Sequence, residues 1–362
     1  MMRTKKKRSS MKVTKKNPEL QSVEKPFFST GSTILNLACS DIAVGAFKPG
    51  SMVNIVGDKQ AGKSIIALTV LAEAARNPAF KEYKLIYDDV EAALCFNIPK
   101  LFGEKLASKI VGPNGVVGES RSDEILEFYY NLDDLLDEGT PFVYVLDSMD
   151  SLTSKSEQAK FEENKKLFRD GKAIKGSYGD GKAKVNSENL RQIVGRLKLT
   201  GSLLIIISQT RDDINPMSFA TKTRSGGKAL GFYALHEMWL AKKSSIKKTI
   251  KGKDRDMGVQ VVSKISKNKS TGRQGKVEFP ILHSYGIDDI SSCIDYLVEE
   301  GVWKKAGKNI NTGEFGFDGT RKALEVFIDT TKDKYQEVTT LCEVNWKEVN
   351  EAASIGRKPK YE

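Results

Sequence analysis

The eight residues GDKQAGKS, at positions 57–64, constrain the fold of this chain more than any other segment. They follow the apolar run 52–56 and precede a second apolar stretch at 65–71. The pattern GxxxxGK[ST] between a strand and a helix is typical of a phosphate-binding loop, because its backbone N–H groups close around phosphate and the helix N-terminus adds its dipole. We therefore predict a nucleotide site formed by Gly57, Asp58, Lys59, Gln60, Ala61, Gly62, Lys63 and Ser64. Lys63 would bind the β- and γ-phosphates, and Ser64 would be a ligand of Mg²⁺.

Four apolar runs alternate with amphipathic helical stretches from residue 27 onward. They lie at 52–56, 84–87, 142–146 and 203–207, and each is rich in β-branched or aromatic residues. Strands that read as continuous apolar runs are buried on both faces, as happens when helices cover both sides of a parallel sheet. The sequence thus predicts an α/β fold with a mostly parallel, twisted sheet flanked by helices.

Polar side chains stand at or just beyond the ends of three of these runs. Asp147 closes FVYVLD and is the candidate carboxylate for Mg²⁺, although an aspartate in this position can also simply cap a turn. Glu91, in DDVEAAL, is placed to activate the attacking water, whereas Asp88 and Asp89 beside it read as structural. Gln209, in ISQTR, is placed to sense the γ-phosphate and pass that state into the loop behind it.

The formal net charge of +11 indicates a polyanionic partner, nucleic acid first, although any single lysine is equally explained as part of a solvated surface. Basic residues dominate the N-terminal tail, residues 1–26, which we expect to be disordered. This tail either contacts DNA phosphates or keeps the chain in solution. Its first sixteen residues contain Arg3, Lys5, Lys6, Lys7, Arg8, Lys12, Lys15 and Lys16, and no acid.

Other classes of protein are not indicated. No apolar stretch reaches the roughly 18 residues of a membrane span, and the N-terminus lacks the apolar part of a secretory signal, so we expect a cytoplasmic protein. The four cysteines form no CxxC pair and suggest neither a disulfide framework nor a zinc site, so we expect reduced, buried thiols. His236 and His283 lack companions for binding a metal and read as structural.

Between the third and fourth apolar runs lies a polar, lysine-rich insertion at about 154–184. It contains Gly171, Gly176, Gly179 and Gly181, which predict a long mobile loop.

Several motifs, taken in order, resemble those of the bacterial RecA recombinases and their phage-encoded relatives. They are FSTGSTILNLA, GDKQAGKS, DDVEAAL, YVLDSMDSLTSK, ISQTRDDINPMSFATKTRSGGKALGFYA, ISKNK and FPILHSYGI. The resemblance extends from about residue 29 to residue 307. A phosphate-binding loop alone is shared by many ATPases, but this ordered set is far more specific.

The resemblance implies a RecA-type ATPase core at 27–286 and a small C-terminal α/β domain with a tail at 287–362. It implies ATP and Mg²⁺ as cofactors, Glu91 as the residue that activates water, and Gln209 as the sensor that couples ATP to DNA. Lys267 and Lys269, in ISKNK, match lysines that reach the γ-phosphate of the neighbouring protomer in this family. There they would stabilise charge in the transition state.

The resemblance also implies two DNA-binding loops, at about 154–184 and 210–225. In the second loop, phosphates would be bound by basic side chains and by glycine N–H groups, and apolar side chains would wedge between base steps. The alternative is that Ile214 and Phe219 only hold the loop against the core. The residues are Arg211, Lys222, Arg224, Gly226 and Gly227 for phosphates, and Ile214, Met217 and Phe219 for bases. In the first loop, lysines would follow backbone charge without reading sequence.

A further basic cluster precedes the segment that contains Lys264 and resembles the hairpin where the family holds incoming duplex DNA. A merely solvated hairpin is the alternative. The cluster consists of Lys242, Lys243, Lys247, Lys248, Lys251 and Lys253. Two departures from the family are visible: only residues 17–25 could correspond to its N-terminal helix, and Ile98 and His283 stand near its adenine-contacting aromatic positions, with Tyr285 close by.

These observations predict an ATP-dependent DNA recombinase, a DNA-dependent ATPase of recombination and repair that coats single-stranded DNA and pairs it with homologous duplex DNA. It would act as a homo-oligomer, in a helical filament. One rival is a ring-forming helicase with the same core, and another is a non-catalytic mediator or annealing partner that binds DNA without strand exchange. The complete set of Lys63, Glu91, Asp147 and Gln209 argues against the second rival.

Overall fold

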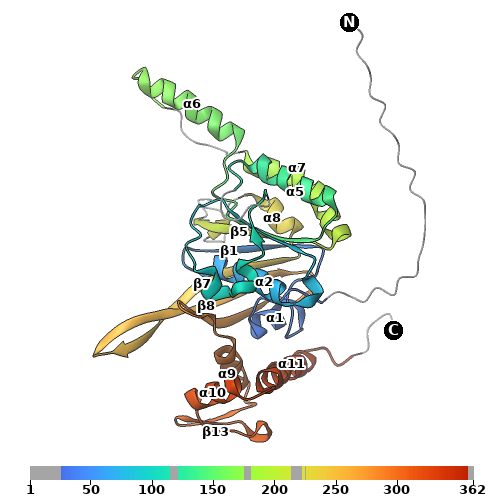
Figure 1. The fold of residues 1–362 in the computed structure, drawn as a ribbon, viewed down its shortest axis with the longest axis vertical. Helices are drawn as coiled ribbons and strands as arrows, with labels where there is room; N and C mark the ends of the chain where they lie inside the picture. The colour runs from blue at the N-terminus through green and yellow to red at the C-terminus, as the bar shows by residue number, and fades with distance from the viewer. Residues whose placement is uncertain (1–25, 115–120, 175–180, 213–221, 225, 358–362) are drawn as a thin grey trace, which may run out of the picture.

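The computed structural model describes residues 26–114, 121–174, 181–212, 222–224 and 226–357. A large central sheet dominates this part of the chain (Figure 1). Its strands are β1 (Ser51–Gly57), β2 (Lys84–Asp89), β3 (Ile110–Val111), β4 (Phe142–Asp147), β5 (Leu203–Asp212), β6 (Lys222–Arg224), β7 (His236–Ile250), β8 (Lys253–Asn268), β9 (Gly275–Leu282) and β10 (Gly286–Ile287). Their order across the sheet is β10-β9-β8-β7-β1-β5-β4-β2-β3, and β6 pairs with the end of β5.

The half of the sheet that contains β1 is parallel. β1 pairs in parallel with β5 and β7, β4 pairs with β5 and β2, and β2 pairs with β3. The four predicted runs lie inside β1, β2, β4 and β5, and β5 continues beyond its run to Asp212. The predicted α/β fold with a mostly parallel sheet flanked by helices is therefore confirmed.

Helices cover both faces of this sheet (Figure 1). The alternation of side chains along β5 shows why both faces are apolar: Leu203, Ile205 and Ile207 join the core beneath α2, whereas Leu204 and Ile206 join the core beneath α5 and α7. The helices before the C-terminal part are α1 (Thr33–Ser40), α2 (Lys63–Arg76), α3 (Ile98–Phe102), α4 (Glu104–Ala107), α5 (Ile125–Glu138), α6 (Lys155–Arg169), α7 (Lys182–Thr200) and α8 (Lys228–Tyr233), with a short 3₁₀ turn at Pro78–Phe80.

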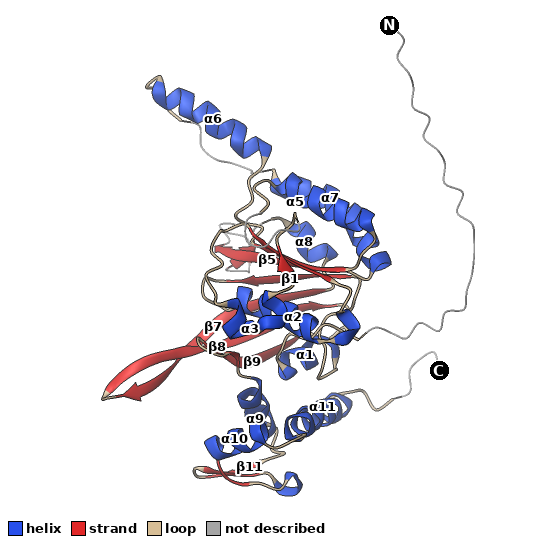
Figure 2. Cartoon of the chain, viewed as in Figure 1, coloured by secondary structure: helices blue, strands red, loops and turns tan. Residues whose placement is uncertain are grey.

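The antiparallel strands β7 and β8 form a hairpin that extends far beyond the rest of the sheet (Figure 2). The first residues of β7 are buried, whereas its second half and the first residues of β8 are mostly exposed. Lys251 and Gly252 connect the strands with positive φ angles of 51° and 72°, as a tight two-residue hairpin turn requires.

The C-terminal part combines three helices with a separate three-stranded sheet. Its elements are α9 (Asp289–Glu299), β11 (Lys304–Ala306), β12 (Asn309–Asn311), a 3₁₀ turn (Gly313–Phe315), β13 (Asp318–Thr320), α10 (Arg321–Thr330) and α11 (Lys334–Ala352). Asp289 joins it to the core, because its carboxylate accepts hydrogen bonds from the Thr33 backbone N–H at 2.6 Å and from the Tyr335 hydroxyl at 2.7 Å.

The prediction of a mobile loop throughout 154–184 is wrong for its first half. Residues 155–169 form α6, which projects from the molecule with no buried residue (Figure 1). Ser154 starts the helix by accepting a hydrogen bond from the Glu157 N–H, while the Glu157 carboxylate accepts one from the Ser154 N–H. The glycines that suggested a loop all follow this capped segment, and the second half lies partly outside the described residues.

One of the two histidines and three of the four cysteines are buried. His236 is buried, and its Nε2 lies 2.9 Å from the Cys39 carbonyl oxygen. Cys39, Cys293 and Cys342 are buried free thiols, but Cys95 is exposed, contrary to expectation. In the part of the chain that the structure describes, no group of His, Cys, Asp and Glu has the makings of a metal cluster. Of the helices described, none has the length and apolar character needed to span a membrane.

Asp88 is a structural residue, as predicted. Its carboxylate is fully buried and accepts hydrogen bonds from the Tyr144 hydroxyl at 2.6 Å, the Ser122 hydroxyl at 2.6 Å and the Ser122 N–H at 2.9 Å. We expect Asp88→Ala to lower the free energy of unfolding by roughly 3 kcal/mol, since buried donors lose their acceptor. Urea denaturation measures this. Asp133→Ala, which removes an exposed partner of Arg196, should cost less than about 1 kcal/mol, and equal losses for both variants would contradict the structural role.

Candidate nucleotide and nucleic-acid site

The loop 57–64 lies at the carboxyl end of β1 and leads directly into α2, as predicted. Gly62 precedes the helix with φ of 84°, and a Cβ there would lie only 2.4 Å from Ile281 Cδ1. A Cβ on Gly57 would lie 2.7 Å from the Leu240 carbonyl oxygen, so both glycines are required sterically. The first N–H groups of α2 have no acceptor within the helix, and they make this end of the loop suitable for an anion.

Lys63 lies within the curve of the loop. Its Nζ donates hydrogen bonds to the carbonyl oxygens of Gly57 at 2.9 Å and Asp58 at 2.8 Å. Burial lowers the pKa of its ammonium group, and the neighbouring carboxylates, Asp147 first, act against that shift. A phosphate group in the loop would add negative charge to that of these carboxylates and could accept hydrogen bonds from Lys63 Nζ in place of the two carbonyl oxygens.

Ser64 and Asp147 meet beside Lys63, as the prediction of a Mg²⁺ site requires. The Ser64 hydroxyl donates to Asp147 Oδ2 at 2.6 Å, and the Tyr87 hydroxyl donates to the same oxygen at 2.5 Å. Burial raises the pKa of the Asp147 carboxyl group. A hydroxyl and a carboxylate are hard oxygen donors, and Mg²⁺ is commonly held by one or two carboxylates together with phosphates, so the residues present fit this ion.

Glu91 and Gln209 are far apart in the sequence but are hydrogen-bonded in the structure. Gln209 Nε2 donates to Glu91 Oε1 at 2.8 Å, and the Ser148 hydroxyl donates to the same oxygen at 2.6 Å. The Gln209 backbone N–H donates to Asp150 Oδ2 at 2.7 Å. The residue predicted to activate water is therefore in direct contact with the residue predicted to sense the nucleotide.

Comparison with known proteins decides the family. The model of the RecA N-terminal domain matches residues 2–288. The chain belongs to the RecA family. It is similar to Protein RecA of Caulobacter vibrioides, with 26% identity over 353 residues, which are 96% of this chain and 88% of that protein. Protein RecA of Brucella suis shares 28% identity over 327 residues, covering 89% of this chain and 81% of the relative. The resemblance stated from the motifs is thus confirmed.

Lys267 and Lys269 of this RecA-family chain lie away from its own phosphate-binding loop. β1 aligns Asn54 with Glu237 of β7, and Glu237 in turn aligns with Lys267 of β8, whereas the loop begins at Gly57. Lys267 is thus level with Asn54, which lies three residues before Gly57. Three strand residues correspond to about 10 Å along the sheet. Its Nζ donates to the carbonyl oxygens of Gly231 at 2.6 Å and Phe232 at 2.8 Å.

The predicted DNA-binding residues of 210–225 are only partly described. Ile214, Met217 and Phe219 lie outside the described residues. Arg211 is exposed, and its Nη2 lies 3.6 Å from Asp150 Oδ1. Lys222 Nζ lies 2.5 Å from Asp58 Oδ2. Gly226 and Gly227 adopt φ of 78° and 80° and fit against α7, where a Cβ on Gly227 would lie 2.6 Å from Ala183 Cβ. Their role in binding phosphate stays a prediction.

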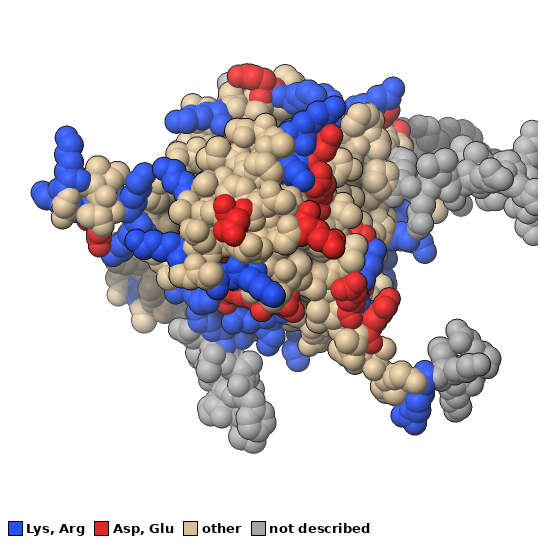
Figure 3. All heavy atoms as spheres, turned by 90° about the horizontal axis from the view of Figure 1, so that it is seen from below, with Lys and Arg blue, Asp and Glu red and all other residues tan. Residues whose placement is uncertain are grey.

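The basic side chains of the β7–β8 hairpin gather at its projecting end (Figure 3). Lys264 is exposed on β8, and Lys243 pairs with Glu278 of β9. Lys242 instead lines a cavity of about 470 Å³ that adjoins Lys63 and Ser64. Among the other lining residues are Phe96, Ile281 and His283, but neither Ile98 nor Tyr285.

Sequence reasoning missed two residues at this site. Tyr87 contacts Asp147 from inside an apolar strand, where an aromatic residue predicts only packing. Phe96 lines the cavity beside the loop, and its place soon after Glu91 was the available signal.

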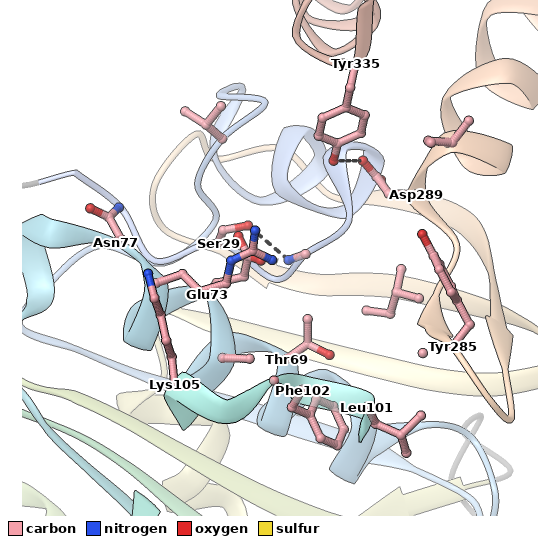
Figure 4. Close-up of a pocket in the computed structure, with 18 of the residues that line it drawn as sticks. Ser29, Thr69, Glu73, Asn77, Leu101, Phe102, Lys105, Tyr285, Asp289 and Tyr335 are labelled. Atoms are coloured by element: carbon pink, nitrogen blue, oxygen red, sulfur yellow. Dashed lines mark hydrogen bonds between the residues drawn. The ribbon is translucent and has the colours of Figure 1, made fainter. Parts of the chain in front are cut away.

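A second cavity, of about 960 Å³, separates α2 from the C-terminal part (Figure 4). It is lined by Thr69, Glu73 and Tyr285, and burial raises the pKa of the Glu73 carboxyl group. None of the predicted catalytic or nucleotide-binding residues lines it, but Leu101 and Gly286 line both cavities, so the two share part of their walls.

Asp58 connects the phosphate-binding loop to the base of the predicted DNA loop. Its two carboxylate oxygens accept hydrogen bonds from Thr210 of β5 and Lys222 of β6, and the bond from Lys222 lowers the pKa of the carboxyl group. These strands pair with each other immediately before and after residues 213–221.

We expect Asp58→Asn to strengthen binding of single-stranded oligothymidylate by the nucleotide-free protein, up to about tenfold at 0.1 M salt, because Lys222 becomes available for one more phosphate contact. The slope of log affinity against log salt should steepen by about 1. Fluorescence anisotropy at several salt concentrations measures both quantities. Asp133→Asn removes a carboxylate partner of Arg196 and serves as the control. Unchanged or weaker binding by Asp58→Asn would show that Lys222 is not withheld by this contact.

Proposed function

We propose that this chain is an ATP-dependent recombinase that assembles on single-stranded DNA and promotes pairing and strand exchange with homologous duplex DNA in the cytoplasm. The observation that carries the proposal is the hydrogen bond from Gln209 to Glu91 at 2.8 Å. Gln209 lies in β5, the strand that runs directly into the predicted DNA loop. The water-activating carboxylate is therefore bonded to the segment that would bind DNA.

In the proposed reaction, Lys63 and the first N–H groups of α2 bind the phosphates of ATP. Mg²⁺, held by Ser64 and Asp147, would neutralise phosphate charge and align the phosphates when bound. Glu91 accepts a proton from the attacking water, and the Ser148 hydroxyl at 2.6 Å orients its carboxylate. The hydrogen bond from Gln209 occupies Glu91 Oε1 and so competes with proton transfer from water. A movement of the Gln209 side chain would therefore release Glu91 for this reaction or hold it back.

A neighbouring protomer completes this site in the proposal. Lys267 and Lys269 lie too far from their own loop to reach its phosphates, but the same position suits a contact with the next subunit in a head-to-tail assembly. Positive charge supplied in this way stabilises the phosphoryl-transfer transition state. ATP at the interface would favour the state that grips DNA, and hydrolysis would release it.

The function is tested with circular single-stranded DNA and homologous linear duplex DNA in the presence of ATP and Mg²⁺. Wild-type protein should exchange strands, and oligothymidylate should stimulate its ATP hydrolysis. Glu91→Gln should lower turnover by about 100-fold or more while DNA binding persists, and Lys63→Ala should lose turnover. Glu138→Gln, which removes an exposed partner of Lys84, should behave as wild type.

Three outcomes would reject the proposal. Rings on DNA under the electron microscope, together with duplex unwinding, would indicate a helicase. Annealing of complementary strands without ATP would indicate a mediator. Equal ATP turnover with and without DNA would refute the coupling between Gln209 and Glu91.

The proposed role of Lys267 carries a pH dependence. Burial, followed by the nearby charge of Lys269, lowers the pKa of Lys267 to about 8. Its positive charge is therefore present below that pH and is lost as pH rises through about 8, well before an ordinary lysine would lose it. We expect kcat/KM for DNA-stimulated ATP hydrolysis to fall over this range. Lys267→Arg, which stays charged, should shift or abolish that fall, and an identical pH profile in both proteins would contradict the role.

A further inference from the structure

A buried ion pair lies beneath the carbonyl groups that hold Lys267. Arg224 Nη1 and Glu237 Oε2 are 2.7 Å apart, and their side chains are only 14% and 11% exposed. Arg224 belongs to β6, the strand that leaves the predicted DNA loop, whereas Glu237 belongs to β7 of the central sheet. A charge removed from water in this way is retained only with a close partner, so the two residues hold each other in place.

Glu237 is fixed from its other side as well. Its Oε1 accepts hydrogen bonds from Trp239 Nε1 at 2.8 Å and from the Ser266 hydroxyl at 3.0 Å. Ser266 immediately precedes Lys267 on β8. The carboxylate therefore joins three strands, with one oxygen facing the base of the DNA loop and the other facing the strand that carries Lys267.

Gly231 lies between this ion pair and Lys267. A Cβ on Gly231 would lie 2.1 Å from Arg224 Nη2 and 2.3 Å from Glu237 Oε2, so α8 rests directly on the ion pair. The Gly231 carbonyl oxygen accepts the 2.6 Å hydrogen bond from Lys267 Nζ. Any displacement of the pair must move this carbonyl or open a gap beneath it.

The geometry points to Glu237 as a positioning residue that links the DNA loop, through Arg224, to the lysine presented to the neighbouring protomer. This inference rests on the proposed function, because it assumes that Lys267 acts on the neighbour's ATP. In this inference, DNA bound beside β6 displaces Arg224, and the ion pair passes that displacement through Gly231 to Lys267. DNA on one protomer thereby regulates hydrolysis in the adjacent one.

Two variants displace the pair in different ways. Glu237→Gln removes the charge that faces Arg224 but keeps a carbonyl oxygen for Trp239 and Ser266. Gly231→Ala keeps both charges and forces them apart, and alanine remains a good helix residue. We expect each variant to lower DNA-stimulated kcat between about tenfold and 100-fold, with KM for ATP within about twofold of wild type. Displacement of a catalytic group by about 1 Å is enough for such losses.

Matched controls separate this effect from general damage. Gly195→Ala places the same methyl group in α7, where nothing lies within 4 Å, and Glu138→Gln removes an exposed carboxylate. Both should retain wild-type turnover. Thermal unfolding of each variant shows whether it is folded, and Gly231→Ala provides the decisive measurement if Glu237→Gln does not fold.

The deciding experiment mixes protomers. Glu91→Gln protomers have an inactive site of their own but present an intact Lys267, whereas Glu237→Gln protomers have an intact site and a misplaced Lys267. In an equal mixture on oligothymidylate, activity should recover to about one quarter of the wild-type rate per protomer. A head-to-tail assembly has four equally frequent ordered pairs of neighbours, and only the pair in which a Glu91→Gln protomer presents Lys267 to the site of a Glu237→Gln protomer is competent. A defect confined to the Glu237→Gln protomer's own site would not be rescued.

A benchmark mixture of Lys267→Ala and Glu91→Gln distinguishes the two levels of failure. If the benchmark recovers and the Glu237→Gln mixture does not, the inference about Glu237 is overturned while the proposed function stands. If the benchmark does not recover, action of Lys267 on a neighbour is refuted and the inference falls with it. Recovery in both mixtures, and in an equal mixture of Gly231→Ala and Glu91→Gln protomers, supports the link.

Discussion

The parallel alignment of β1, β5, β4 and β2 is the constraint on which this site depends. Parallel strands bring their carboxyl ends to one edge, so Gly57 lies opposite Gln209, and Asp89 lies opposite Asp147. The predicted phosphate-binding loop, the predicted Mg²⁺ ligand Asp147 and the predicted sensor Gln209 therefore share one edge of the sheet, although Gly57 and Gln209 are more than 150 positions apart. Apolar side chains on both faces of the strands hold that edge in register.

Polar contacts lead outward from this edge to the predicted DNA loop in two directions. Asp58 of the phosphate-binding loop bonds Thr210 and Lys222 on the two strands that flank residues 213–221. Arg224, at the end of the second strand, turns the other way and pairs with Glu237 beneath α8. The same short hairpin thus contacts the chain's own predicted phosphate-binding loop and the surface proposed to serve the next protomer. The Asp58–Lys222 pair is 45% exposed on each side, whereas the Arg224–Glu237 pair is mostly shielded from water, so the second contact is the stronger constraint on geometry.

The strand positions, and the place of residues 57–64 between a strand and a helix, are confirmed because their signals are local. A continuous apolar run, or a glycine-lysine motif between a strand and a helix, needs no knowledge of distant residues. The helix at 155–169 was missed because glycines further along the insertion outweighed the Ser154 and Glu157 cap. Glu237 was missed for a different reason. A carboxylate in a buried strand has no periodic signature, and its partner Arg224 read as one more phosphate-binding cation.

From the amino-acid sequence alone follow the α/β fold, a strand-loop-helix motif at 57–64 that suits a phosphate, a carboxylate at Asp147 and the ordered motifs of the RecA family. Those features follow from the chemistry of short segments. The folded structure was needed to show that Gln209 bonds Glu91, that Asp58 holds Lys222, and that Arg224 is buried against Glu237 instead of facing solvent. Each of these contacts joins side chains from different strands or loops, and which side chains meet is set by how the strands align in the folded sheet.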